Sequence, residues 1–242
     1  MKHKGLIIGS AIFLGIIALL IIAFFVYVGS YYEADVEAIA AFDYEGFDIR
    51  EIDDGTIAYV PKEEYDTGII FYPGGKVEYS AYIPLMKSIA SRGVLCILVD
   101  MPFNLAVFDI DRADGIYEGF VSVDNWYMAG HSLGGSMACE YVSSNLSFFK
   151  GVILLASYSA VDLSESQLKV LSIYGSVDEV LNKESYEGSK ANLPKDTTEY
   201  VILGGNHAYF GVYGEQDGDG EATITNSEQI EETSIKIIEF LK

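Results

Sequence analysis

The chain has 242 residues, of which 50% are hydrophobic, and its formal net charge at pH 7 is −21. This length fits one sizeable domain with an appendage. Binding of nucleic acid needs a basic surface, so the charge argues against a nucleic-acid partner and is typical of a solvated, soluble surface.

An apolar run opens the chain. Residues Gly5–Val28 form a stretch of 24 residues without a charge, which is long enough to cross a bilayer. Lysines precede the run and acids follow it, so we expect a cytoplasmic stub at 1–4, a transmembrane anchor at 5–28, a tether at 29–45 and an extracytoplasmic domain at 46–242. The alternative is a cleaved secretory signal, but the run exceeds the usual signal core. Both interpretations export the domain.

Short apolar runs alternate with helical patterns from residue 46 onward. Asp53-Asp54-Gly55 is a hairpin turn signal between the first two runs. Continuous apolar strands between helices predict an α/β fold, a mostly parallel, doubly wound sheet of about eight strands with no large cap. The ligand site then lies beyond the carboxyl ends of the strands. Strands are predicted at 47–52, 56–60, 68–72, 94–99, 126–129, 151–156, 168–174 and 199–203, and helices at 79–91, 137–144 and 227–241, with a short helix within 111–120.

The segment Asn125–Gly135, NWYMAGHSLGG, carries a serine with a glycine two residues away on either side. Between a predicted strand and a predicted helix, this pattern indicates a nucleophile elbow. The turn is sharp, and side chains at Gly130 and Gly134 would collide with the adjoining strand and helix. Ser132 is therefore the predicted nucleophile.

A serine hydroxyl needs a base within hydrogen-bond reach, and the chain has three histidines. His3 lies across the predicted membrane from the domain. His131 is the neighbour of Ser132, and in such a turn its side chain points away from the hydroxyl. His207, just after the last predicted strand, remains as the predicted base.

The base needs a carboxylate to fix its tautomer and to stabilise its charged form. Asp178 follows a predicted strand and gives the chain order Ser, Asp, His. The alternative is that Asp178 only caps the helix predicted to start near Val180. In that case Glu179 or Asp162 would supply the carboxylate.

An acyl-transfer site also needs donors for the developing oxyanion. The backbone N–H of Leu133 is one predicted donor. The second is expected from the loop Pro73-Gly74-Gly75-Lys76, whose glycines let the backbone approach a substrate closely. We assign it to Gly75, and the side chain of Lys76 is expected to border the site.

The ordered set GHSLGG, YGSVD and GGNH, on alternating strands and helices, resembles the α/β-hydrolase superfamily over roughly residues 46–242. FYPGGKVE and GGNHAYFGVYGEQDGDGEATIT are similar to a bacterial subgroup of small, capless proteins that are loosely related to dienelactone hydrolases and often carry an N-terminal membrane segment. The resemblance implies an eight-strand sheet, an acyl-enzyme, and Ser132, Asp178 and His207 as its triad. Dienelactone hydrolases proper usually carry cysteine as nucleophile, so Ser132 counts against a dienelactone substrate.

The loop after the predicted base is aromatic at first and then acidic. Tyr209 and Phe210 are predicted to wall an apolar acyl pocket. Asp217, Asp219 and Glu221 alternate in a way that suits Ca²⁺, but a full calcium loop needs more oxygen ligands at fixed positions. We therefore expect a solvated acidic loop, no metal and no cofactor.

These features predict a membrane-anchored, extracytoplasmic serine hydrolase that cleaves an ester or related acyl bond of a small-molecule substrate. Two alternatives remain. An acyltransferase acting on a cell-surface acceptor would use the same residues, whereas a tethered binding domain would keep the fold without turnover. The intact set of Ser132, Asp178 and His207 argues against the binding domain.

Overall fold

The computed structural model describes residues 2–53 and 55–242, and it leaves the side chains of residues 2–12 and 53 undescribed. The chain divides into two units, Met1–Tyr31 and Tyr32–Lys242. The first contains helix α1 (Lys2–Val28). Within the described residues, no helix has the length and apolar character needed to cross a membrane. The predicted anchor at 5–28 falls partly outside the described side chains, and Asp54 of the predicted hairpin turn also lies outside the described residues.

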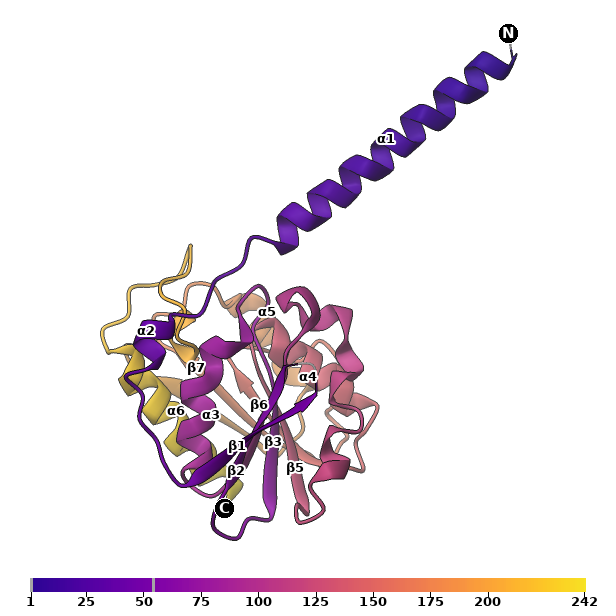
Figure 1. Ribbon diagram of the computed structural model, residues 1–242. Helices are drawn as coiled ribbons and strands as arrows, with labels where there is room; N and C mark the ends of the chain where they lie inside the picture. Colours follow the sequence, from indigo (N-terminus) through magenta and orange to yellow (C-terminus); the bar gives the residue numbers. More distant parts are fainter. Residues whose placement is uncertain (1, 54) are drawn as a thin grey trace. The chain divides into compact units, whose positions relative to one another are not determined.

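The second unit is built on one eight-stranded sheet in the order β1-β2-β4-β3-β5-β6-β7-β8 (Figure 1). Strands β3 to β8 pair in parallel, whereas β2 pairs antiparallel with both β1 and β4. The predicted α/β fold with a mostly parallel sheet of eight strands is confirmed. The strands are β1 (Phe47–Asp53), β2 (Thr56–Pro61), β3 (Thr67–Tyr72), β4 (Leu95–Leu98), β5 (Asn125–His131), β6 (Phe149–Leu155), β7 (Lys169–Gly175) and β8 (Thr197–Ile202).

The central strands are apolar on both faces because both faces are covered. In β3, Ile69 and Phe71 belong to one buried cluster, and Ile70 and Tyr72 belong to the other. Successive side chains of a strand point to opposite faces, so a continuous apolar run supplies both clusters. This is the physical reason that the run pattern in the sequence predicts a doubly covered sheet.

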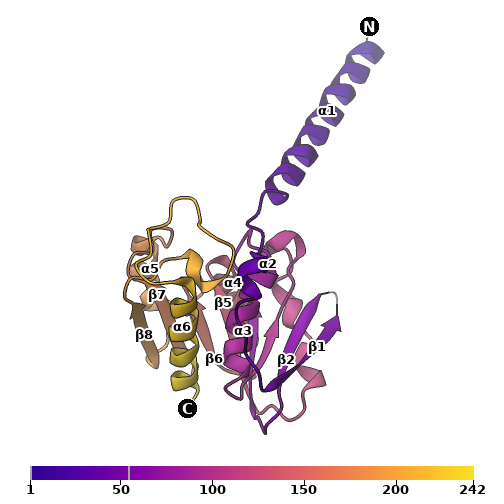
Figure 2. The same ribbon diagram turned by 60° about the vertical axis from the view of Figure 1, so that its left-hand side comes forward.

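Helices α3 (Ile83–Ala90) and α6 (Asn226–Leu241) lie together on one face of the sheet, as Figure 2 shows. The Ser88 hydroxyl of α3 donates to Glu231 of α6 at 3.3 Å, and Arg92, which follows α3, forms an ion pair with the same carboxylate. Helix α6 starts at a capping box in which Thr225 and Glu228 satisfy each other's backbone N–H groups. The remaining α-helices are α2 (Val36–Ile39), α4 (Leu133–Ser143) and α5 (Lys183–Ser189), of which α4 packs on the opposite face from α3.

Two helix predictions need adjustment. The predicted helix at 79–91 is a 3₁₀ turn (Tyr79–Tyr82) followed by α3. The short helix predicted within 111–120 is two 3₁₀ turns, Ile110–Ala113 and Ile116–Gly119, because Gly115 between them has a φ of 75° and interrupts right-handed winding. Further 3₁₀ turns lie at Pro102–Asn104, Ala106–Phe108, Lys190–Asn192 and Ala208–Phe210.

The pairing of β6 with β7 depends on a glycine. A Cβ built at Gly151 would overlap the carbonyl oxygen of Lys169 and lie 3.0 Å from a ring carbon of Tyr127. We expect Gly151→Ala to lower the free energy of unfolding by about 1–3 kcal/mol, the usual cost of overpacking. The matched control is Gly188→Ala in α5, where nothing lies within 4 Å of the added atom. That change should raise the free energy of unfolding by about 0.5–1 kcal/mol.

Urea denaturation measures the free energy of unfolding of both variants. An unchanged denaturation midpoint for Gly151→Ala would contradict the close packing at this glycine.

Candidate active site

Ser132 stands alone between two regular elements. Strand β5 ends at His131, helix α4 begins at Leu133, and Ser132 between them has φ 50° and ψ −123°. A Cβ at Gly130 would lie 2.5 Å from the backbone carbon of Gly134, and a Cβ at Gly134 would overlap the carbonyl oxygens at the end of β3. The strained turn therefore requires both glycines, and it sets Ser132 at the carboxyl end of the parallel strands.

The loops after β7 and β8 bring a carboxylate and an imidazole together. Nδ1 of His207 lies 3.0 Å from Oδ2 of Asp178, and both residues are buried, with 2% and 3% exposure. An ionised carboxylate only accepts hydrogen bonds, so Nδ1 of His207 carries the proton and donates it to Asp178. This leaves the lone pair of His207 Nε2 available as a base.

The second oxygen of Asp178 organises its own turn. Oδ1 accepts the backbone N–H groups of Val180 at 3.0 Å and of Leu181 at 2.8 Å. The sequence left open whether Asp178 orients the histidine or caps a helix near Val180. Oδ2 faces the histidine, and Oδ1 closes a turn that precedes α5 without capping it. Helix α5 has its own N-cap, Asn182. The fallback acid Asp162 is exposed and accepts the N–H of Ser164.

Ser132 and His207 line the same cavity, which has a volume of about 230 Å³. Part of its wall, Ala156–Tyr158, follows β6 and was not singled out in the sequence. The Ser157 hydroxyl donates to the Ser132 carbonyl at 2.6 Å and fixes the elbow from this side. In the sequence, the only sign that these residues belong to the site was their position directly after β6, which pairs with β5. The other lining residues are Leu133, Ser136, Val180, Leu181 and Asn182.

The two predicted oxyanion donors lie on neighbouring segments, a helix and a loop, and of the two only Leu133 is among the residues that line the cavity. Leu133 is the first residue of α4, where backbone N–H groups have no acceptor within the helix. A Cβ at Gly75 would lie 2.8 Å from Cδ2 of Leu133, so a larger residue at this position would require the leucine side chain to shift. Lys76 follows with a φ of 61°, and its backbone N–H donates to the carbonyl of Asn104 at 2.7 Å.

A buried chain of hydrogen bonds connects the Gly74–Gly75 loop with the turn at Ser132. The N–H of Gly74 donates to the Tyr82 hydroxyl at 3.1 Å, and that hydroxyl lies 2.8 Å from Nδ1 of His131. Burial raises the pKa of Tyr82, so its hydroxyl keeps its proton and shares a hydrogen bond with His131. The ring centroids of His131 and His207 are 4.6 Å apart. Burial first, and then the neighbouring His207, holds the pKa of His131 well below its usual value, so His131 is neutral.

The two aromatic residues predicted to wall the acyl pocket are not among those that line this cavity. Phe210 is fully buried, with its ring centroid 5.6 Å from that of His131. Tyr209 is half-buried and lines a separate cavity of about 450 Å³ together with the acidic loop. In that loop Asp217 is exposed, whereas Asp219 accepts the backbone N–H of Ala208 at 2.8 Å. The described residues contain no group of three or more His, Cys, Asp or Glu side chains placed to hold a metal ion.

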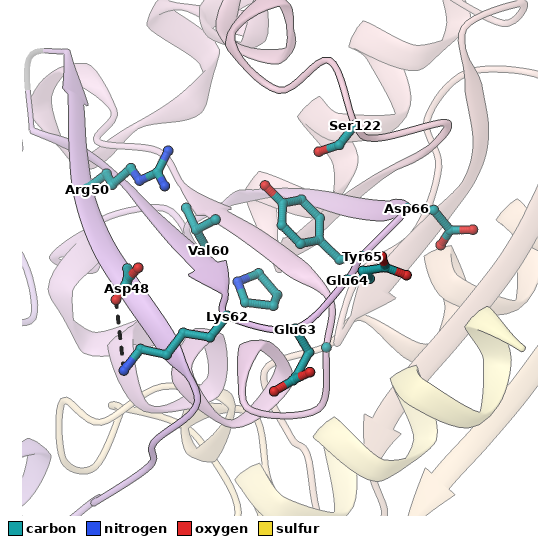
Figure 3. Close-up of a pocket in the computed structure, with 11 residues that line it drawn as sticks. Asp48, Arg50, Val60, Lys62, Glu63, Glu64, Tyr65, Asp66 and Ser122 are labelled. Carbon is teal, nitrogen blue, oxygen red and sulfur yellow. Dashed lines mark ion pairs between the residues drawn. The ribbon is translucent and has the colours of Figure 1, made fainter.

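A larger cavity, about 860 Å³, lies away from this site (Figure 3). Its wall includes Asp66 and Ser122, which precede β3 and β5, so it is at the amino ends of the parallel strands. Charged side chains such as Arg50 and Lys62 surround it, and Lys62 pairs with Asp48 at 3.9 Å. No histidine is among its lining residues, so its size does not make it the site of acyl chemistry.

The comparisons with known proteins agree with this arrangement. A model of the alpha/beta hydrolase family matches residues 68–231. The chain therefore belongs to the alpha/beta hydrolase family, as its resemblance implied. No curated protein sequence matches it.

Solved structures of esterases and of a dienelactone hydrolase have a similar fold. Est1E from Butyrivibrio proteoclasticus is 16% identical, with a TM-score of 0.58 over 81% of this chain and 99% of that chain. A further structure of Est1E contains bound ferulic acid. An esterase from Pyrobaculum calidifontis is 15% identical, with a TM-score of 0.60 over 85% of this chain and 88% of that one. Dienelactone hydrolase from Anabaena variabilis is 13% identical, with a TM-score of 0.61 over 82% of this chain and all (100%) of that chain.

Burial of a neutral His131 has a consequence for the pH dependence of stability. Below about pH 6.5 the unfolded chain binds a proton at this position that the folded protein cannot bind. Stability should therefore fall as the pH falls, by up to about 1.4 kcal/mol per pH unit from this group alone. In His131→Gln that contribution is absent. The free energy of unfolding, measured by urea at about pH 7.5 and about pH 5.5 for both proteins, tests this. The same pH dependence in both would contradict a buried neutral imidazole.

Proposed function

We propose that this protein is a serine hydrolase that cleaves an ester or related acyl bond. Ser132 is the nucleophile, His207 the base and Asp178 the acid that orients the base. One observation carries the proposal: His207 is buried against Asp178 at 3.0 Å and shares a cavity with Ser132, which stands in a strained turn. Membership of the alpha/beta hydrolase family and the esterase fold of similar structures support it.

The proposed reaction has two halves. Oγ of Ser132 attacks the substrate carbonyl while Nε2 of His207 takes the hydroxyl proton, and the backbone N–H groups of Leu133 and Gly75 stabilise the oxyanion. The tetrahedral intermediate expels the alcohol, which receives the proton from His207, and an acyl-enzyme remains. Water then attacks the acyl carbon with the same base. This second half releases the acid and restores the serine.

The cavity indicates the size and polarity of the acyl group. Its volume of about 230 Å³ is below the roughly 300–1,000 Å³ typical of sites for drug-sized ligands. Its lining contains hydroxyl, amide and apolar side chains but no lysine, arginine or carboxylate. Short or flat uncharged acyl groups therefore fit best. Because ferulic acid binds Est1E, an aromatic feruloyl ester belongs in the first substrate series beside short aliphatic esters.

Replacement of the nucleophile should abolish turnover. We expect Ser132→Ala to lose both hydrolysis of a short p-nitrophenyl ester and labelling by a fluorophosphonate, because the attacking oxygen is absent. His207→Ala should lose both as well. Ser122→Ala is the matched control, since Ser122 is an exposed serine at the opposite edge of the sheet. Labelling of Ser132→Ala at the wild-type rate would refute the proposed nucleophile.

We also propose that the hydrolase unit is attached to the outer side of a membrane by the apolar run. The support is in the sequence: Gly5–Val28 is a stretch of 24 uncharged residues, Lys2 and Lys4 precede it, and acids follow it. The positive-inside rule then places the amino terminus in the cytoplasm and the catalytic unit outside.

Cysteine labelling on intact cells tests this orientation. Both native cysteines, Cys96 and Cys139, are free and buried, so they give a low background. Val121 is 95% exposed, and Val121→Cys therefore presents one accessible thiol. A membrane-impermeant maleimide should label this variant on intact cells, and the label should sediment with the membranes. Labelling that appears only after the cells are lysed would place the unit in the cytoplasm and contradict the proposal.

A further inference from the structure

The acidic loop after β8 crosses the carboxyl edge of the sheet, where Figure 2 shows it (orange) arching above β7 and α6. One carboxylate in this loop, that of Asp219, turns inward. Its Oδ2 accepts the backbone N–H of Ala208 at 2.8 Å, and its Oδ1 accepts those of Gly220 at 2.8 Å and Glu179 at 3.3 Å. Two of these three donors come from other segments of the chain.

These two donors lie next to the proposed base and the proposed acid. Ala208 directly follows His207 and begins the 3₁₀ turn Ala208–Phe210, and Glu179 directly follows Asp178. One side chain therefore holds both the segment that carries the proposed base and the segment that carries the proposed acid. Hydrogen bonds to an ionised acceptor are stronger than neutral ones, so a carboxylate is well suited to this task.

Neighbouring contacts hold the loop itself in register. The side-chain amide of Asn206 donates to the carbonyl of Gly220 at 3.0 Å, and a Cβ at Gly220 would overlap the carbonyl oxygen of Val177. The side-chain amide of Gln229 in α6 binds the backbone of Asn206. It accepts the Asn206 N–H at 3.0 Å and donates to the Asn206 carbonyl at 2.8 Å. The Asp219 carboxylate is thus supported from the two loops that it joins and from the last helix.

We propose that Asp219 is a positioning residue that fixes the distance and angle between His207 and Asp178. The proposal rests on the proposed function, in which these two residues are base and acid. Asp219 does not line the cavity of Ser132 and His207, and it acts through the backbone next to each member of the pair. The structure therefore gives the acidic loop a role in holding the catalytic residues.

The experiment compares three variants of the full-length protein. In Asp219→Ala both acceptor oxygens are lost, so the rate of fluorophosphonate labelling and the kcat for a p-nitrophenyl ester should fall about 10- to 100-fold, the scale expected for a misplaced catalytic group. KM should change little, because the cavity wall does not include Asp219. Asp219→Asn keeps one acceptor oxygen and should retain an intermediate rate. Asp217→Ala removes the same charge from an exposed side chain of the same loop and should match the wild type.

A spectroscopic measurement separates positioning from general loss of structure. The Nδ1 proton of His207, hydrogen-bonded to Asp178, gives a downfield NMR resonance that is identified by its loss in His207→Ala. This resonance should shift or vanish in Asp219→Ala and persist in Asp217→Ala, while the remaining amide spectrum stays folded. If Asp219→Ala is too unstable to study, the same comparison with Asp219→Asn decides.

The outcomes are distinct. An unchanged resonance and an unchanged labelling rate in the Asp219 variants would overturn the positioning role. Equal losses in Asp219→Ala and Asp217→Ala would also overturn it, because loop charge alone would then explain the effect. If the folded wild-type protein is not labelled at all, the proposed hydrolase function fails. The resonance would still show whether Asp219 holds the His207–Asp178 pair.

Discussion

The site depends on one close approach, that of the first turn of α4 to the carboxyl end of β3. No side chain fits at Gly134, where the helix meets the carbonyl oxygens of Tyr72 and Pro73, and Gly75 lies directly against the side chain of Leu133. This contact holds the elbow and the Gly74–Gly75 loop at a fixed separation. The N–H groups of two segments about 60 residues apart can therefore point toward one small volume.

Around this contact, buried polar groups have partners, with the exception of Nε2 of His131. The Gly74 N–H, the Tyr82 hydroxyl and the His131 imidazole form one chain of hydrogen bonds, and His131 stays neutral within it. Asp178 and His207 form a second polar pair. Because an unpaired buried donor or acceptor costs about 1–3 kcal/mol, these partners are parts of the fold as well as of the site. Stability and the geometry of the candidate site thus rest on the same atoms.

The sequence predicted those features that local pattern determines. Apolar runs located the eight strands, and the glycine spacing located the turn at Ser132. Elimination among three histidines selected His207, which the structure brings into the cavity with Ser132. Features that depend on long-range packing were not predicted. Tyr82 and His131 are 49 positions apart in the chain, and no local pattern links them.

In the loop after β8, sequence patterns suggested roles that long-range packing does not support. Its aromatic residues predicted a pocket wall from their chemistry alone, yet Phe210 is fully buried, because packing against His131 decides its place. Its acids suggested a metal or a solvated surface. Asp219 instead bonds three backbone N–H groups, and an isolated acidic pattern carries no information about such partners. Asp217, two residues earlier, is exposed, so one short motif contains both outcomes.

The first residue of the second unit contacts two loops of the candidate site. Tyr32, the first residue of the hydrolase unit, donates its N–H to the Lys76 carbonyl at 2.8 Å, and its hydroxyl accepts the N–H of Asp217 at 3.1 Å. Tyr32 therefore joins the loop that carries Gly75 to the loop that carries Asp219. These are two of the segments that surround the candidate site, and neither contact follows from a local pattern, because Tyr32 and Asp217 are 185 positions apart in the chain.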